Sequence, residues 1–309
     1  SACLVGSEMC IRDRIKSLLL ISLIFLLNSC KEQRSDKELW QSLFNGKDLS
    51  EWEIKFANHD LNFNLNDTFR VQDSMIRISY DDYKTFDDSY AHIYYNKPFS
   101  YYKLRFDYRF LGDQVSGGES WNIRNSGIML PSQSARSNDF GQFFPVSIEI
   151  QLLGGLGKEM RTTGNLCTPG TAVEIDGMIN YRHCIKSTSA TYHGDQWVKG
   201  EVIVLGGERI THLIENDTVL KYQLPQIGGG FTNPRMGDQD WFSRGVESKD
   251  YWIAKEGEVL IEGYIALQAE SHPIDFKNIE ILNLCGCMDP KAKNYKSYFV
   301  KSNNRLCIY

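Results

Sequence analysis

Three polar side chains recur at two-residue spacing near the C-terminal end of the chain, and their types are those of a reactive site. In the segment 263–281, GYIALQAESHPIDFKNIEI, small or apolar residues alternate with Gln268, Glu270 and His272. Residues two apart on an extended strand face the same side, so one face would present an amide, a carboxylate and an imidazole. A carboxylate and an imidazole can transfer protons, which makes this face a candidate wall of a site. The alternative is a solvated strand face that ends in a turn at Pro273.

A second polar face is predicted for the run 146–153, VSIEIQLL. Its apolar residues alternate with Ser147, Glu149 and Gln151, so the opposite face is wholly apolar. Glu149 and Gln151 would stand about 7 Å apart along one strand face. If this strand and the segment 263–281 lie in one sheet, their polar groups could converge.

Many short strands are needed to position these groups. Alternation of apolar and polar residues predicts a half-buried antiparallel strand over 103–110. Further short strands are expected at 201–205, 210–214 and 219–222, with Gly206-Gly207 and Asn216-Asp217 as hairpin turns. No long segment after the N-terminal apolar run keeps a helical apolar period, so the sequence predicts an all-β sandwich or jelly roll.

Two irregularities interrupt this pattern. Ile279 follows Phe276 by three residues rather than two, which predicts a bulge or bend near Lys277 and Asn278. Polar or glycine-rich insertions run over 112–122 and 228–257. Long loops in a compact β domain are often functional, so these two are expected to rim a site or to decorate the surface.

Composition and charge narrow the class of protein. The 309 residues are 42% hydrophobic and 12% aromatic, which suits one main globular domain with small appendages. The formal net charge is −5, and Lys and Arg are scattered along the chain. Nucleic acid is therefore not expected as a partner.

The N-terminus resembles a bacterial lipoprotein leader. Basic residues at positions 12, 14 and 16 precede the apolar run 18–27, which has the length of a signal-peptide core. LNSC at 27–30 resembles a lipobox, which implies lipidation of Cys30 and a polar tether over 31–39. The expected location is the cell envelope, anchored to the outer membrane and facing the periplasm or the outside. A plain signal peptide and an uncleaved anchor are the alternatives.

The cysteines beyond Cys30 fit an exported chain. Disulfides persist outside the cytoplasm, and Cys167 with Cys184 is the preferred pair. Such a bridge would stabilise the fold by roughly 3 kcal/mol in the chain-entropy model. A zinc site is the rival, but Cys285 and Cys287 are separated by one residue rather than the usual two.

Four blocks stand out in order along the chain: LFNGKDLSEW at 43–52, RNSGIML at 124–130, SIEIQLLG at 147–154 and the segment 263–281. They resemble, in the same order, the blocks of the 3-keto-disaccharide hydrolase family, whose members are also described as 3-keto-glucoside 1,2-lyases and 3-keto-2-hydroxyglucal hydratases. The resemblance covers about 40–284 and implies a concanavalin A-like jelly roll of two antiparallel sheets that acts on oxidised glycosides.

The last 25 residues, 285–309, resemble a short C-terminal module of Bacteroidetes surface proteins. That resemblance implies a disulfide between Cys287 and Cys307, and hence a disulfide-closed appendage. Asn303 and Asn304 replace the acidic pair of the usual motif, which weakens a proposal of calcium binding.

Cleavage of a 3-keto glycoside assigns roles to the candidate residues. The ketone acidifies the hydrogen on C2, so the site needs a base at C2, an acid for the leaving oxygen and a group that polarises the ketone. Glu149 is the expected base, His272 the acid or polariser, and Glu270 a second base or ligand. The residues expected to bind substrate are Gln151, Gln268, Arg124 and His193. A divalent metal is possible, held by Glu149, His193 and His272.

Two competing functions can be compared with the sequence. A retaining jelly-roll glucanase needs two closely spaced carboxylates in an E-x-D-x-x-E pattern, but Gln151 and Gly154 stand where the second and third acids would be. That class is therefore disfavoured. A non-catalytic surface module for carbohydrate binding or adhesion remains the alternative to an enzyme.

Overall fold

The computed structural model describes residues 37–232 and 236–309. The predicted leader, lipobox and lipidation at Cys30, with most of the tether, lie outside these residues. Leu39–Tyr309 forms one compact unit. None of the helices in the described part of the chain has the length and apolar content of a membrane-spanning helix.

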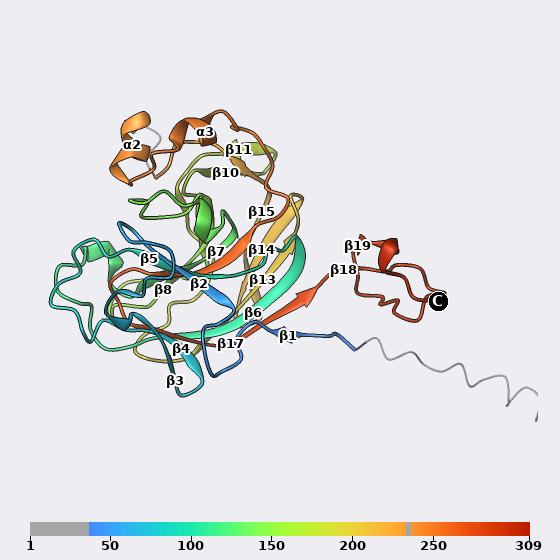
Figure 1. Cartoon of the computed structure of the whole chain (residues 1–309), viewed down its shortest axis with the longest axis horizontal. Helices are drawn as coiled ribbons and strands as arrows, with labels where there is room; N and C mark the ends of the chain where they lie inside the picture. Colours follow the sequence, from blue (N-terminus) through green and yellow to red (C-terminus); the bar gives the residue numbers. More distant parts are fainter. Residues whose placement is uncertain (1–36, 233–235) are drawn as a thin grey trace, which may run out of the picture. The chain divides into compact units, whose positions relative to one another are not determined.

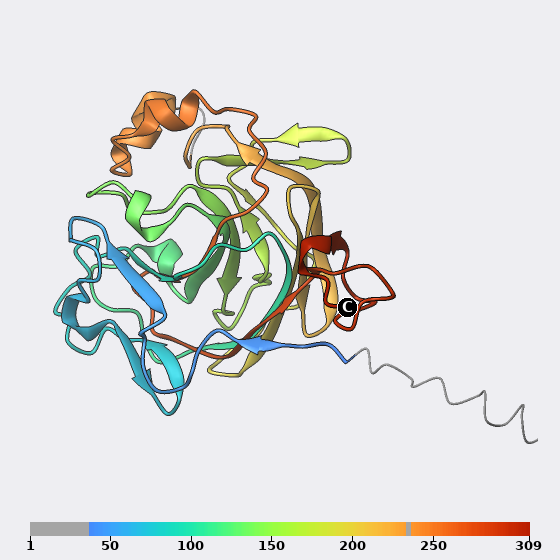
Figure 2. The same cartoon turned by 45° about the vertical axis from the view of Figure 1, so that its right-hand side comes forward.

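The unit is built from two antiparallel β-sheets, drawn in Figure 1 and turned in Figure 2. In spatial order, the larger sheet, sheet A, contains β11 (Met178–Asn180), β10 (Thr171–Ile175), β15 (Asp217–Ile227), β14 (Arg209–Ile214), β13 (Val198–Leu205), β6 (Tyr101–Phe110), β17 (Ile274–Asn283), β4 (Met75–Ile78) and β3 (Phe69–Gln72), with β1 (Gln41–Ser42) paired to β17. Sheet B contains β12 (Cys184–Ile185), β9 (Asn165–Cys167), β8 (Ser147–Leu153), β7 (Asn125–Ser132), β16 (Tyr264–Ala269), β5 (Ala91–Tyr95) and β2 (Trp52–Phe56). The predicted two-sheet jelly-roll sandwich is confirmed.

Short helical turns lie in the connections. They are η1 (Leu65–Asp67), η2 (Ser120–Asn122), η3 (Ala135–Ser137), α2 (Asp238–Ser243), α3 (Lys249–Ile253) and η5 (Asn304–Leu306). Helices α2 and α3 lie in the predicted insertion 228–257 and are drawn in orange in Figure 1.

Apolar side chains from both sheets meet in one core, as the alternation predicts. On β6, Tyr102, Leu104 and Phe106 are buried in this core, whereas Lys103 and Arg105 are not. The same period on β8 buries Ile148, Ile150 and Leu152 against the core and turns Glu149 and Gln151 to the outer face of sheet B.

The predicted bulge in β17 is confirmed. The register between β17 and β6 shifts between Lys277 and Glu280, and Asn278 has a positive φ of 52°. The extra residue lets Phe276 and Ile279 both face the core although they are three residues apart.

Both predicted disulfides are present, Cys167–Cys184 and Cys287–Cys307. The first joins directly opposite residues of β9 and β12. The second closes the C-terminal segment, which contains the short parallel pair β18 (Cys285–Gly286) and β19 (Lys301–Ser302). Cys285 has a free thiol. The domain boundaries expected near residues 40 and 285 stay predictions.

Candidate functional site

Two buried carboxylates lie on the outer face of sheet B. Glu149 is on β8, and Glu270 directly follows β16, with β7 between these two strands. Glu149 is 6% exposed and Glu270 is 3% exposed. Both line one pocket, so the predicted convergence of the two polar strand faces occurs for these two acids.

Gly127 on the intervening strand β7 makes room for the Glu149 side chain. Gly127 is in register with Gln151, and a methyl group built on it would overlap the carboxyl and Cγ of Glu149. The Glu149 carboxyl therefore lies across β7, toward β16 and Glu270. A side chain at position 127 would exclude it from this place.

The pocket has a volume of about 390 Å³, within the usual range for small-molecule sites. Its lining comprises Trp121, Asn125, Phe144, Glu149, Gln151, Cys167, Pro169, His183, Cys184, Thr232, Arg244 and Glu270. Trp121 comes from the insertion 112–122, and Thr232 and Arg244 from the insertion 228–257. Both insertions thus rim the pocket, as the sequence predicts.

Burial changes the protonation of the acid pair. Removal from water raises the pKa of Glu149 to about 8. The pKa of Glu270 is raised well above its usual value, first by burial and then by the charge of Glu149, although Arg244 lowers it. At neutral pH Glu149 is therefore mostly protonated, with a smaller ionised fraction that can act as a base, whereas carboxyl groups in water are almost wholly ionised.

Several buried polar atoms around the pair have no hydrogen-bond partner within the described residues. Four belong to the pocket lining: Asn125 Oδ1, Glu270 Oε2, His183 Nδ1 and Arg244 Nε. The fifth, Gln268 Oε1, belongs to a predicted substrate-binding residue that lies on β16 outside the lining. Buried polar groups in proteins are normally hydrogen-bonded, so the four atoms of the lining are available to a polar ligand. Gln151 already accepts a hydrogen bond from Asn165 Nδ2 at 3.1 Å.

His272 does not join this pocket, contrary to the sequence-based expectation. The backbone has φ of 75° at Ser271, so the strand alternation ends directly after Glu270. The His272 ring packs edge-on against Phe110, with ring centroids 5.7 Å apart, and Phe110 belongs to the core between the sheets. His272 thus packs against the core rather than beside Glu149. Burial lowers the pKa of His272 to about 4.

Arg124 and His193 also lie outside the pocket lining. Arg124 forms an ion pair with Asp195 at 2.8 Å and donates to the carbonyl of Gly194. His193 Nδ1 accepts a hydrogen bond from the backbone N–H of Gly157 at 3.1 Å, in an exposed loop. The structure therefore gives both residues a part in holding loops together.

The predicted metal ligands Glu149, His193 and His272 are consequently not gathered. Within residues 37–232 and 236–309, the potential ligand atoms of Cys167, His183 and Cys184 do lie within 4.8 Å of one another. The two thiols of that group are joined in a disulfide, so they cannot bind a metal as thiolates.

Residues 39–282 match the family model described as a 3-keto-alpha-glucoside-1,2-lyase-like domain. The chain belongs to this 3-keto-glucoside lyase-like family. The match confirms the resemblance seen in the sequence over 40–284. A comparison with curated proteins finds no match.

The lyase-like domain also resembles solved structures at low identity. Two candidate glycosyl hydrolases from Parabacteroides distasonis are 19% and 17% identical to it, with TM-scores of 0.45 and 0.44; each match covers 79% of this chain and 93% or 99% of the other. The exoplasmic/lumenal domain of VIP36, bound to Ca²⁺ and Man3GlcNAc, is 12% identical, with a TM-score of 0.44, covering 84% of this chain and 96% of that one. At these values we draw no conclusion about activity from the structural neighbours.

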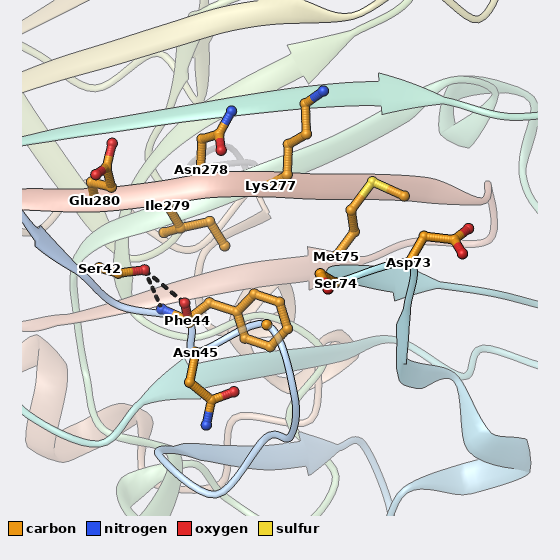
Figure 3. Close-up of a pocket in the computed structure, with 11 residues that line it drawn as sticks. Ser42, Phe44, Asn45, Asp73, Ser74, Met75, Lys277, Asn278, Ile279 and Glu280 are labelled. Atoms are coloured by element: carbon orange, nitrogen blue, oxygen red, sulfur yellow. Dashed lines mark hydrogen bonds between the residues drawn. The ribbon is translucent and has the colours of Figure 1, made fainter.

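A second pocket of the lyase-like domain, about 510 Å³ in volume, lies on the outer side of sheet A along the β17 bulge. Figure 3 shows Lys277, Asn278 and Glu280 pointing away from Phe44 and Asn45. Glu280 is paired with Arg105 at 2.8 Å, and the Lys277 ammonium lies 3.8 Å from the centroid of the Trp197 ring. The charged groups of Lys277 and Glu280 are thus engaged with other residues of the protein.

Sequence reasoning missed several residues of the Glu149 pocket, among them Asn125, His183 and Arg244. Asn125 lies in NSGIMLPS, a strand buried on both faces, whose sequence has no strict alternation to single it out. His183 lies beside Cys184 and is brought to the pocket by the disulfide. Arg244 lies in a long insertion, and its place depends on contacts distant in the sequence.

Proposed function

We propose that this domain cleaves the glycosidic bond of 3-keto glycosides, with Glu149 and Glu270 exchanging the protons. The observation that carries this proposal is the buried acid pair beside Arg244 in one pocket of a 3-keto-glucoside lyase-like domain. Buried pairs of acids with unequal pKa values are the arrangement that acid–base enzymes use near neutral pH. Lyase and net hydrolase are two outcomes of the same elimination.

The proposed reaction begins with proton abstraction. Ionised Glu149 removes the proton from C2, and the electron pair of the C–H bond forms the enolate of the C3 ketone. The enolate electrons then form the C1–C2 double bond as the bond between C1 and the glycosidic oxygen breaks. Glu270, whose pKa is raised by burial and by the charge of Glu149, gives its proton to the leaving oxygen. Addition of water, with OH to C1 and a proton to C2, completes net hydrolysis.

Arg244 is the proposed group that polarises the ketone, in place of His272. It is cationic, it lies close enough to Glu270 to lower the pKa of that acid, and its Nε has no partner within the described residues. A fixed cation stabilises an enolate oxygen as negative charge develops on it. Gln151 and Gln268 are proposed to bind sugar hydroxyl groups.

The two disulfides indicate an extracytoplasmic protein. We further propose a lipid anchor at Cys30, which would hold the enzyme at the outer membrane. The support for the anchor is the leader sequence alone.

The test is turnover of methyl 3-keto-glucosides of both anomers by purified residues 31–309, with divalent metals supplied and then chelated. The expected result is release of methanol, lowered at least 1,000-fold by Glu149→Gln with binding of the glycoside retained. Glu280→Gln, a change in the other pocket, should leave turnover unchanged. Glycan binding without turnover in the unaltered protein would instead favour a carbohydrate-binding module, for which the half-exposed Trp121 at the pocket is a suitable platform.

A further inference from the structure

The outer face of sheet B is covered on one side of the acid pair. Tyr94, Met129 and Ala266, on three neighbouring strands, are at most 1% exposed and pack with Ala135 of η3 in a second apolar cluster. This cluster lies on the pocket side of the sheet, because its strand residues are in register with Glu149. A ligand therefore cannot extend over β16 and β5 in that direction.

The loop that holds Phe144 and the insertion that holds Arg244 close over the same side of the pocket. The backbone N–H of Phe143 donates to the carbonyl of Arg244 at 3.0 Å. Asp139 accepts hydrogen bonds from the N–H and Oγ of Ser248 at 2.8 and 2.7 Å. Lys55, a buried lysine of β2, donates to the carbonyl of Phe140 at 3.0 Å. The bonds of Phe143 and Asp139 tie the loop that holds Phe144 to the insertion that holds Arg244, and the bond of Lys55 ties that loop to β2. The wall is therefore part of the fold.

The opposite side of the pocket is closed by the Cys167–Cys184 disulfide. Cys167 is directly opposite Glu149 on β9, and Cys184 is directly opposite Cys167 on β12. With Pro169 and His183 they line the pocket as a second wall. Trp121, which is 45% exposed, marks the open side. The site is thus a blind pocket rather than a groove that crosses the sheet.

The buried floor offers acceptors to hydroxyl groups. Asn125 Oδ1, in the pocket lining, has no partner within the described residues, and Asn125 is only 3% exposed. Gln268 Oε1 also has no partner there, but Gln268 lies on β16 next to the lining rather than in it. A buried acceptor left unpaired costs free energy, so such a site favours a ligand that brings a matching donor. A sugar unit with free hydroxyl groups does so.

We infer that the pocket admits only a 3-keto unit at the non-reducing end of a glycoside, with a hydroxyl group buried against Asn125. This inference rests on the proposed function, because bond cleavage at C1 requires the leaving group to point to the open side. The remaining positions of the ring then face the walls. A 3-keto unit in the interior of a chain, substituted at O4 as well as at C1, does not fit.

The test uses two β-1,4-linked glucose trisaccharides, one with the ketone on the non-reducing terminal unit and one with it on the middle unit. Cleavage is followed by chromatography, and binding to the Glu149→Gln variant by calorimetry. The trisaccharide with the terminal ketone should bind and be cleaved. The trisaccharide with the internal ketone should bind at least 100-fold more weakly and be cleaved at least 100-fold more slowly.

Binding decides this inference separately from catalysis. If the trisaccharide with the internal ketone binds with an affinity within tenfold of the other, the blind pocket is overturned, whether or not that trisaccharide is cleaved. If neither trisaccharide binds, the inference is overturned as well. Preference for the terminal unit without cleavage by the unaltered protein supports the pocket and contradicts the proposed function alone.

A variant tests the floor. Asn125→Ala should weaken binding of the terminal-ketone trisaccharide 10- to 100-fold, whereas Asn45→Ala, in the other pocket, should have no effect. Equal binding by Asn125→Ala and the unaltered protein would overturn the role given to Asn125.

Discussion

At the scale of single residues, the account depends on where the Glu149 carboxyl lies. Its place across β7 requires the absence of a side chain at Gly127, and its raised pKa requires the burial that the pocket walls provide. The consequences for activity and for stability can be tested separately.

Gly127→Ala should lower kcat/KM at least 100-fold, because the new methyl group displaces the Glu149 carboxyl from beside Glu270. The pH dependence of kcat should also change, since the displaced acid is in a different environment. Gly200→Ala is the matched control: its methyl group would overlap the Phe106 ring in the core, far from the acid pair. That variant should lose stability but keep its kcat/KM. Equal kcat/KM in Gly127→Ala and the unaltered protein would contradict the placement of Glu149.

Glu149→Gln should stabilise the fold at high pH. The pKa of the Glu149 carboxyl is about 4.5 in the unfolded chain and about 8 in the folded protein. As pH rises between these two values, ionisation of the carboxyl lowers the free energy of unfolding. At pH 8.5 the ionised carboxyl lowers the free energy of unfolding by on the order of 4 kcal/mol, and the uncharged glutamine has no such effect. The difference in Tm between variant and unaltered protein should therefore grow from pH 5 to pH 8.5. A difference that stays constant or shrinks over this range would argue against a buried acid.

At the scale of elements, the two disulfides have different parts in the molecule. Cys167–Cys184 ties the short edge strand β12 to β9 and forms a pocket wall beside Glu149, whereas Cys287–Cys307 closes the C-terminal segment. Each closes a loop of similar length, about 20 residues, so the chain-entropy effects should be similar, at roughly 3 kcal/mol. Their effects on activity should differ.

Replacing Cys167 and Cys184 together by Ala should lower the free energy of unfolding and reduce kcat/KM about tenfold or more, because the wall and His183 lose their support. Replacing Cys287 and Cys307 together is the control, which should lower stability and leave kcat/KM unchanged. Chemical denaturation and steady-state kinetics measure both quantities. A larger loss of activity in the C-terminal pair would contradict the assignment of the wall.

The elements could be predicted from the sequence much better than the site. Strict alternation located β6, β8 and β16, and a three-residue spacing located the bulge of β17. Glu149 and Glu270 followed from the same alternation. His272 did not, because one residue with a positive φ, Ser271, ended the alternation before it.

The rest of the site depends on contacts that no local pattern contains. Arg244 is brought to the acid pair by backbone bonds between its insertion and the loop at Phe143. Asn125 lies in β7, a strand that is buried on both faces. The sequence of this strand therefore resembles that of any core strand.

At the scale of the whole molecule, the sandwich supplies a rigid floor and the insertions supply the walls. The leader predicts where this domain is held. In a Bacteroidetes host, the full chain should fractionate with the outer membrane, and Cys30→Ala should move it to the soluble envelope fraction, because the acylated residue is lost. Membrane retention of the variant would show that another segment holds the protein.

The most direct test of the central claim is the fate of the C2 hydrogen. Cleavage of a methyl 3-keto-glucoside in D2O should give 3-keto-glucose with one deuterium at C2, because Glu149 removes the original proton and solvent replaces it. The product incubated with the protein in D2O controls for later exchange, and Glu149→Gln should abolish both cleavage and labelling. Cleavage that leaves the original hydrogen on C2 would contradict elimination and the role of Glu149 as the base.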